Sequence, residues 1–389
     1  MDCPNCHAGK PRVFHRISDV PVNSCVLLRT PAEARDFPCA SIDLAFCESC
    51  GFVFNRAFEQ SLVEYSQRYE ETQGFSETFR AFHIDLASRL IARHDLHEKT
   101  LLEVGCGKGE FLLLLCELGN NTGVGFDPAY VPKRQGSKAR NQVQFFREFY
   151  TGKHVDHKAD FLCCKMTLEH IPNSLDFMRM LRCSLENSDH TTIFFMVPDA
   201  TRILRDCAFE DIYYEHCSYF AHSSLSRLFQ CAAFTILRVS QEYEGQYLTI
   251  EAVPGVPSSI ELSSHGRDHA LLANYVARFP DRYAAKRDSW DRQLHALSQN
   301  AKKVILWGSG SKAVSFLTTS DAPSAIDYVV DINPFRHGHF MPGTAQEIVS
   351  PEFLVDYKPD VVILMNPIYV REVANTLRLM NLSPQLLTM

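Results

Sequence analysis

The chain has 389 residues, of which 46% are apolar and 22% charged, and its net charge is −7 at pH 7. These proportions exclude wholesale disorder, and the excess of acidic residues argues against a face that binds nucleic acid. The apolar runs are far shorter than the roughly 18 residues that a membrane span needs, and the first residues do not form an export signal. We therefore expect a cytoplasmic protein of two or three domains that acts on small molecules.

Two CxxC pairs frame the first 50 residues, Cys3 with Cys6 and Cys47 with Cys50. Each pair lets two thiolates of one tight turn reach a single ion, and together they supply the four soft ligands that zinc favours. We expect a structural zinc ion in an N-terminal domain, residues 1–60, that has little core of its own. Four unrelated buried cysteines are the alternative.

The next segment, residues 62–94, carries aromatic and apolar side chains at helical spacing. This spacing predicts a helical connector. Tyr65 and Tyr69 are four residues apart, and they share one face if the helix already includes them.

A glycine-rich loop follows the connector. Residues 100–104 predict a buried strand that runs straight into Gly105, Gly107 and Gly109, and a second strand ends at Asp127. Alternating glycines let a ligand approach bare backbone near a helix N-terminus, and an acid at the tip of the second strand can accept both ribose hydroxyls. The pattern predicts a nucleotide-type site in a doubly wound α/β sheet.

Glu103 precedes this loop, and a carboxylate there would repel a pyrophosphate but attract an ammonium group. This favours S-adenosylmethionine (SAM), whose sulfonium is cationic, over a nicotinamide or flavin nucleotide. Glu148 and Phe149, after the third strand, are candidates for contact with adenine, although a surface acid and a core aromatic explain them equally well.

Four polar side chains follow the fourth and fifth strands: His170, Tyr213, Glu215 and His216. Methylation of carbon needs an enolate, and therefore a base and a group that holds the oxyanion. Histidine titrates near neutrality and tyrosine can donate to an oxyanion, while a carboxylate can fix the imidazole tautomer. We expect His216 as base, Tyr213 and His170 as oxyanion or hydroxyl partners, and Glu215 as the orienting acid; satisfied structural histidines are the alternative.

A second nucleotide-type unit begins after a linker around residues 254–264 and a helical stretch. Residues 303–307 predict a strand that enters Gly308, Gly310 and Lys312, and the next strand ends at Asp331. We expect this unit to bind the nucleotide of an acceptor, with Lys312 near a phosphate. Binding of NAD is the main alternative.

The order of these motifs resembles the three-domain SAM-dependent sugar C-methyltransferases. The resemblance covers nearly the whole chain and rests on Cys3, Cys6, Cys47 and Cys50, on the loops 103–109 and 308–312, and on the segments 167–172 and 212–216. It implies an N-terminal zinc-binding domain, a class I (Rossmann-like) methyltransferase core and a C-terminal Rossmann-like α/β domain. Members methylate a ring carbon beside a ketone in nucleotide-linked deoxysugars. In that family the histidine matching His216 is the favoured base. Residues matching Tyr213, Glu215, His170 and, approximately, Tyr65 and Tyr69 line the same pocket.

We therefore predict an enzyme of three parts: a zinc-binding domain (1–60), a connector with the SAM-binding domain (61–253), and a helical linker with an acceptor-binding domain (254–389). The predicted activity is SAM-dependent C-methylation of a nucleotide-linked sugar. The alternatives are O- or N-methylation of another small metabolite, an NAD-binding oxidoreductase, and a non-catalytic binding protein.

Overall fold

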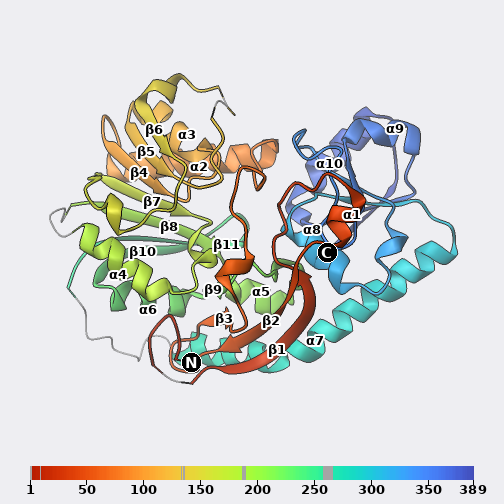
Figure 1. Cartoon of the computed structure of the whole chain (residues 1–389), viewed down its shortest axis with the longest axis horizontal. Coiled ribbons are helices and arrows are strands. Elements are labelled where there is room, and N and C mark those ends of the chain that lie inside the picture. Colours follow the sequence, from red (N-terminus) through yellow and green to blue (C-terminus); the bar gives the residue numbers. More distant parts are fainter. Residues whose placement is uncertain (1, 9, 133, 135, 186–189, 257–265) are drawn as a thin grey trace.

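The computed structural model describes residues 2–8, 10–132, 134, 136–185, 190–256 and 266–389. Three sheets form the molecule (Figure 1): a small antiparallel sheet, a seven-stranded sheet, and a five-stranded parallel sheet. Among the described residues, no helix is both long and apolar enough to cross a membrane. Part of the predicted linker, residues 257–265, lies outside the described residues.

The N-terminal sheet has the order β1-β2-β3-β9 and is antiparallel. Its strands are β1 (Arg12–Pro21), β2 (Cys39–Phe46), β3 (Val53–Asn55) and β9 (Ser218–Tyr219). A short helix, α1 (Pro31–Arg35), lies between the first two strands. The last strand comes from a segment some 160 residues further along the chain, so the N-terminal sheet is completed by the middle region.

The central sheet has the order β10-β11-β8-β7-β4-β5-β6. The strands are β4 (Thr100–Val104), β5 (Thr122–Phe126), β6 (Val143–Phe146), β7 (Phe161–Lys165), β8 (Thr192–Pro198), β10 (Phe234–Glu242) and β11 (Tyr247–Pro254). The helices are α2 (Glu77–His94), α3 (Glu110–Gly119), α4 (Ser174–Ser184), α5 (Ala200–Asp206) and α6 (His222–Cys231). Strands β4 to β8 are parallel, while β10 and β11 add an antiparallel hairpin at one edge.

The strand order of the central sheet reverses between β4 and β7, which are neighbours. In doubly wound sheets, ligands bind at the carboxyl ends of the strands on either side of such a reversal. The loops after β4, β5 and β7 therefore meet at one edge, as the sequence predicts.

The C-terminal sheet is parallel, with the order β14-β13-β12-β15-β16. Its strands are β12 (Val304–Trp307), β13 (Tyr328–Val330), β14 (Glu347–Val349), β15 (Val361–Leu364) and β16 (Gln385–Thr388). The helices of this region are α7 (Gly266–Gln299), α8 (Ser311–Thr319), α9 (Leu354–Tyr357) and α10 (Val370–Leu379). The long helix α7 passes beneath the N-terminal sheet and reaches the C-terminal region (Figure 1).

One apolar cluster joins the three regions. It contains Ile42 of the N-terminal sheet, Tyr214 of the middle region, Phe279 of α7 and Phe316 of α8, all almost fully buried. Burial of large apolar side chains is the main stabilising contribution to folding. The regions therefore share a core and hold one another in position.

The connector differs from the prediction in where its helix begins. Helix α2 starts at Glu77, because the hydroxyl of Ser76 accepts a hydrogen bond from the backbone N–H of Phe79 at 3.2 Å and caps the first turn. Tyr65 and Tyr69 precede the helix in irregular backbone, where Tyr69 forms an isolated antiparallel bridge with Val26. This irregular segment runs from the N-terminal region to the central sheet.

Candidate active site

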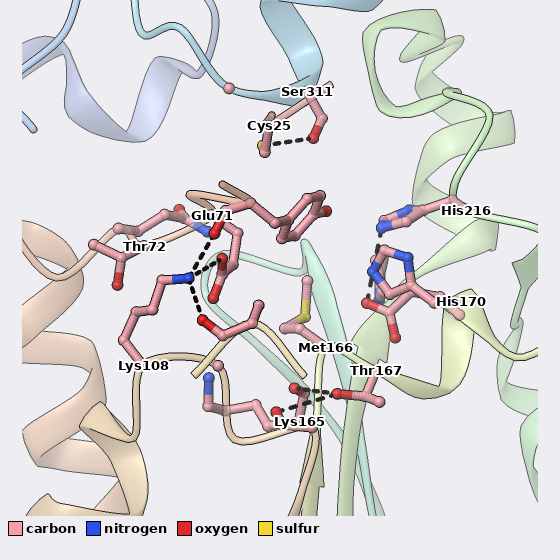
Figure 2. Close-up of a pocket in the computed structure, with 18 of the residues that line it drawn as sticks. Cys25, Glu71, Thr72, Lys108, Lys165, Met166, Thr167, His170, His216 and Ser311 are labelled. Carbon is pink, nitrogen blue, oxygen red and sulfur yellow. Dashed lines mark hydrogen bonds and ion pairs between the residues drawn. The ribbon is translucent and has the colours of Figure 1, made fainter. Parts of the chain in front are cut away.

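A cavity of about 790 Å³ lies at the carboxyl edge of the central sheet and extends to the C-terminal sheet. Its lining includes Gly105, His216 and Lys312, one residue from each of the three polar loops that the sequence predicts. Figure 2 shows His170 and His216 on one side of the cavity and Lys108 and Glu71 on the other. This volume is typical of a site for small molecules.

The glycine loop has the backbone that the sequence predicts. Gly105 and Gly107 have positive φ angles of 69° and 54°, which glycine adopts without steric cost. The carboxylate of Asp127 accepts hydrogen bonds from the backbone N–H groups of Gly107, at 2.9 Å, and Ala129, at 2.7 Å. Burial raises the pKa of Asp127. Gly109 is the N-cap of α3 but does not line the cavity, since a Cβ atom there would lie 2.5 Å from the ring of Phe145. Glu110, in the first turn of α3, does line it, so the helix N-terminus borders the cavity.

Two carboxylates that line the cavity, those of Glu103 and Glu71, each have one buried oxygen that makes no hydrogen bond within the described part of the chain. That oxygen of Glu71 lies 3.6 Å from Nζ of Lys108, with which it forms an ion pair. Burial raises the pKa of both groups to about 7. A cationic ligand would favour their ionised form. Glu71 was not predicted from the sequence, because it lies in irregular backbone outside any motif.

Of the two candidates for contact with adenine, one lines the cavity and the other does not. Phe149 lines the cavity, with its ring 6.2 Å from that of Tyr65. Glu148 is not among the lining residues, and its carboxylate lies 3.6 Å from Nε2 of His154. The position of Phe149 is compatible with contact to a ligand, whereas the Glu148 side chain is directed to a neighbouring histidine.

His216 is the most buried of the predicted polar groups that titrate near neutrality. Its Nε2 lies 2.8 Å from the hydroxyl of Tyr213, and its ring centroid is 4.7 Å from that of His170. Nδ1 of His216 has no hydrogen-bond partner among the residues described. Burial, with smaller contributions from His170 and Lys312, holds the pKa of His216 well below its usual value, so the imidazole is neutral at pH 7.

The carboxylate of Glu215 does not face the imidazole of His216, in contrast to the expected orienting role. It accepts hydrogen bonds from the backbone N–H of Ser24 at 2.8 Å, from the Ser24 hydroxyl at 2.6 Å and from the Tyr69 hydroxyl at 3.0 Å. The Ser24 hydroxyl also lies 2.7 Å from that of Ser311 in α8. Glu215 is therefore the point at which the three regions of the chain meet, a position that spacing alone does not indicate.

His170 has one ring nitrogen already engaged. Its Nδ1 lies 3.0 Å from the backbone carbonyl of Glu215 and 2.8 Å from the Tyr65 hydroxyl. A carbonyl only accepts, so Nδ1 carries the hydrogen, and the neutral ring has its lone pair on Nε2. Burial lowers the pKa of His170 to about 4. In this state Nε2 of His170 can only accept a proton or a hydrogen bond. A residue that stabilises an oxyanion must donate a hydrogen bond, so this state of His170 does not suit the predicted role.

A further acid, Glu169, lies beside these histidines. It belongs to a one-turn 3-10 helix, Leu168–His170, directly after β7, and one oxygen lies 3.9 Å from Nε2 of His216. Neither carboxylate oxygen has a hydrogen-bond partner among the described residues. His170 of this loop was predicted as a site residue and its neighbour Glu169 was not, although both follow strand four, where the loops of such a sheet reach the ligand.

Two cations line the cavity beside the C-terminal loop: Lys312 of α8 and Arg202 of α5 in the middle region. Lys312 and Arg202 both contact the carboxylate of Asp211. Burial alone would raise the pKa of Asp211, but the charges of Lys312 and Arg202 hold it below its usual value. Two cations share one anion, so this wall of the cavity keeps a positive charge that can attract a phosphate.

Asp331 holds the second glycine loop in place. One carboxylate oxygen accepts hydrogen bonds from the backbone N–H of Ser309 at 2.9 Å and from its hydroxyl at 2.5 Å. Gly308 and Gly310 line the cavity on either side of Ser309, and a Cβ atom added at either glycine meets nothing within 4 Å. Open space therefore borders the backbone of this loop, as a bound ligand requires.

The four predicted metal ligands converge. Sγ of Cys3 lies 3.7 Å from Sγ of Cys50, that of Cys6 lies 3.9 Å from that of Cys47, and all four sulfurs lie within 4.8 Å of one another. Four thiolates bound tetrahedrally at about 2.3 Å are about 3.8 Å apart, so the cluster fits a single metal ion. With four sulfur ligands the coordination shell is closed, which suits a structural role.

Two parts of the chain match known protein families. Residues 75–239 match the family described as "Methyltransferase domain", and residues 264–383 match the family described as "C-methyltransferase C-terminal domain". The chain therefore joins a methyltransferase domain to a C-methyltransferase C-terminal domain, behind an N-terminal four-cysteine cluster.

Among curated proteins, the chain is similar to the C-methyltransferase NovU of Streptomyces niveus, with 25% identity over 191 residues. The match spans 46% of each chain, so it covers about half of that relative. Similar solved structures include the 1,6-didemethyltoxoflavin N1-methyltransferase of Burkholderia thailandensis (16% identity, TM-score 0.35, 46% of this chain and 81% of that one). Another is the magnesium protoporphyrin IX methyltransferase of Synechocystis with bound S-adenosylhomocysteine (16% identity, TM-score 0.35, 46% of this chain and 84% of that one).

Proposed function

We propose that this protein is a SAM-dependent C-methyltransferase that methylates a carbon beside the ketone of a nucleotide-linked deoxysugar. One observation carries the proposal: a single cavity is lined by the glycine loop after β4, by His216, and by Lys312 of the C-terminal region. A donor, a base and a phosphate-bearing acceptor can therefore meet in one cavity. The similarity to a C-methyltransferase supports the transfer of the methyl group to carbon.

The donor half of the cavity suits a cationic nucleoside. When bound, SAM supplies an electrophilic methyl group at its sulfonium. Gly105 and Gly107 offer bare backbone near the N-terminus of α3, which Gly109 caps, and the Asp127 carboxylate is held beside them by two backbone hydrogen bonds. Glu103 provides negative charge within the same wall and, with Phe149, completes the proposed donor site.

The reacting end uses His216 as the base. A neutral imidazole can take the proton from the carbon beside the ketone, which leaves an enolate to attack the methyl group. The Tyr213 hydroxyl lies 2.8 Å from Nε2 of His216, and burial raises the pKa of Tyr213 well above the usual value. The hydroxyl therefore stays protonated and can donate a hydrogen bond to the enolate oxygen of the acceptor. Tyr65 and Tyr69 are proposed to contact the sugar, because both line the cavity.

The acceptor's nucleotide is proposed to bind at the C-terminal region. Gly308 and Gly310 offer exposed backbone at the start of α8, while Lys312 and Arg202 supply positive charge for phosphate. We assign this role to a domain of residues 254–389. The methyltransferase unit then comprises residues 61–253, and residues 1–60 form a domain with a structural Zn²⁺ ion on Cys3, Cys6, Cys47 and Cys50.

Calorimetry with SAM and with NAD, each in a separate titration, tests the donor assignment; tight binding of NAD without SAM would overturn the proposal. Turnover is then measured with a nucleoside-diphosphate 4-keto-6-deoxysugar as the acceptor probe, and the product's methyl group is located by NMR. We expect a new C–CH₃ bond. An O–CH₃ or N–CH₃ product would establish a different methyltransferase.

The variant His216→Asn tests the base, with the exposed His295→Asn as the matched control. We expect His216→Asn to bind SAM normally and to lose at least about 10²-fold in kcat, the usual contribution of a general base. His295 lies outside the cavity, so its replacement should leave kcat unchanged. Unchanged turnover of His216→Asn would remove this residue from the base role.

A further inference from the structure

Two buried polar groups face each other in the reacting half of the cavity without a hydrogen bond between them. Glu169 is 1% exposed and His216 is 4% exposed, and a carboxylate oxygen of Glu169 lies 3.9 Å from Nε2 of His216. Both oxygens of Glu169, and Nδ1 of His216, have no hydrogen-bond partner within the described part of the chain. Buried polar atoms of folded proteins are usually paired, and these three, which lie close together at the cavity, are among those of this chain that are not.

The carboxylate of Glu215, the residue next to His216, is not available to the imidazole. Glu215 is held by Ser24 and Tyr69, whereas a carboxyl oxygen of Glu169 lies within 4 Å of a ring nitrogen of His216. The backbone of Glu169 is fixed as well, because its carbonyl accepts a hydrogen bond from the Cys217 thiol at 3.5 Å, one residue beyond His216. This hydrogen bond links the two loops, so the side chains of Glu169 and His216 are held opposite each other.

We propose that Glu169 is the positioning residue of the base: its carboxylate faces Nε2 of His216 and stabilises the imidazolium that forms when His216 takes the acceptor's proton. This inference rests on the proposed function and names the acid that the reaction uses. With hydrogen on Nε2, His216 donates to the oxygen of the Tyr213 hydroxyl at 2.8 Å and has the Glu169 carboxylate at 3.9 Å, and the lone pair lies on Nδ1, the nitrogen without a partner.

The proton moves from the acceptor to His216, and no other group gains or loses one. The C–H bond of the carbon beside the ketone breaks, its electron pair stays on the acceptor as the enolate, and a new N–H bond forms at Nδ1. Glu169 keeps its charge and gains no proton. The enolate then takes the methyl group, and the sulfonium becomes the neutral thioether of S-adenosylhomocysteine.

Charged and titratable groups around Glu169 set when it is ionised. They are Lys165, His170 and His216, with Cys164, Cys217, Tyr65, Tyr213 and Tyr247 as further titratable neighbours. Burial raises the pKa of Glu169 to about 8, against weaker opposing contributions that include Lys165. The carboxyl is therefore neutral below about pH 8 and charged above it. Stabilisation of the imidazolium, and with it kcat, should rise with pH through this range.

A measurement without acceptor tests the pair directly. Protein labelled with ¹³C at the histidine Cε1 atoms is titrated from pH 5.5 to 9.5, and His216→Asn identifies the His216 resonance. We expect that resonance to shift as Glu169 ionises near pH 8. The shift should be absent in Glu169→Gln and present in Glu98→Gln, a control at an exposed position. Unchanged signals from histidines remote from Glu169, such as the exposed His295, show that the variant is folded, and an identical titration in Glu169→Gln and wild type would overturn the proposal.

Turnover of the same acceptor probe supplies the second measurement. Opposite charges 3.9 Å apart at an effective dielectric constant of about 20 change an equilibrium about 10³-fold at most, so we expect Glu169→Gln to lower kcat about 10²-fold, with little change in KM. The rise of kcat toward pH 8 should disappear, and Glu169→Asp should restore part of it. Full turnover in Glu169→Gln together with collapse in His216→Asn would refute the role of Glu169 and leave the proposed function standing. Full turnover in both variants would refute the base assignment itself.

Discussion

Replacing Gly105 by alanine should damage the donor site more than any other single-methyl change in the glycine loop. Gly105 has φ of 69°, and a Cβ atom there would lie 2.0 Å from Oγ1, 2.5 Å from Cγ2 and 2.7 Å from Cβ of Thr167. Thr167 cannot turn aside freely, because its hydroxyl donates to the carbonyls of Gly105, at 3.3 Å, and Lys165, at 3.2 Å. The left-handed backbone costs about 1–2 kcal/mol for alanine, and overpacking adds about 1–3 kcal/mol.

The sum is about 2–5 kcal/mol, which corresponds to a loss of about 30-fold to more than 10³-fold in affinity if the loop is displaced. Calorimetric titration with S-adenosylhomocysteine measures this loss, and thermal unfolding shows how much of the cost falls on stability. Gly152→Ala is the matched control, since an added Cβ meets nothing within 4 Å there. Affinity within twofold of wild type and an unchanged Tm for Gly105→Ala would refute the assigned geometry of the loop.

Three further changes test other parts of the molecule. Chelation of the proposed Zn²⁺ ion, or Cys47→Ser, should abolish the metal measured by mass spectrometry and lower Tm by several degrees, because the free energy of binding a metal to four thiolates adds to the free energy of folding; full stability without metal would contradict this. Glu251→Gln should cost about 1–3 kcal/mol in urea unfolding at pH 7, because the carboxylate then no longer pairs with His94, whose Nε2 lies 2.7 Å away. Burial makes the largest single contribution and would raise the pKa of Glu251, but the hydrogen bond from His94 and the charges of Arg93, His94 and Arg238 together lower it. The contribution of Glu251 to stability is therefore present above its unfolded pKa and lost as the pH falls through its folded pKa, and the variant should lack that acid-dependent loss. Gln246→Leu should cost about 1–3 kcal/mol, because the side-chain amides of Gln246 and Asn366 exchange hydrogen bonds of 3.2 and 2.9 Å between the central and C-terminal regions; equal urea midpoints would contradict that.

Much of the fold could be predicted because it depends on local patterns. The strand Thr100–Val104, the turn at Gly105 and the strand Thr122–Phe126 are contiguous, and each is marked by its own residue types. The convergence of Cys3, Cys6, Cys47 and Cys50 could be predicted for the same reason, since CxxC spacing constrains two ligands within one turn.

The details of the site could not be predicted from spacing alone. Residues 212–216 have irregular backbone, so adjacent side chains such as Glu215 and His216 point to different partners, and no period of a helix or strand says which. Glu71 and Glu169 acquire their positions from contacts between segments distant in sequence, and an acid without a motif resembles a surface residue. The helix of the connector was predicted to begin too early, because aromatic residues at helical spacing also occur before Ser76, the residue that caps α2.

The hydrogen-bonded junction of Ser24, Glu215 and Ser311 restricts how such a protein can be recombined. Each of its members belongs to a different third of the chain, and Glu215 immediately precedes His216. A chimera that takes its C-terminal third from a homologue without a hydroxyl at position 311 would disturb the segment that carries the histidine, even with every cavity-facing side chain retained. Exchange of acceptor specificity between relatives therefore requires transplanting this junction together with the nucleotide-facing loop.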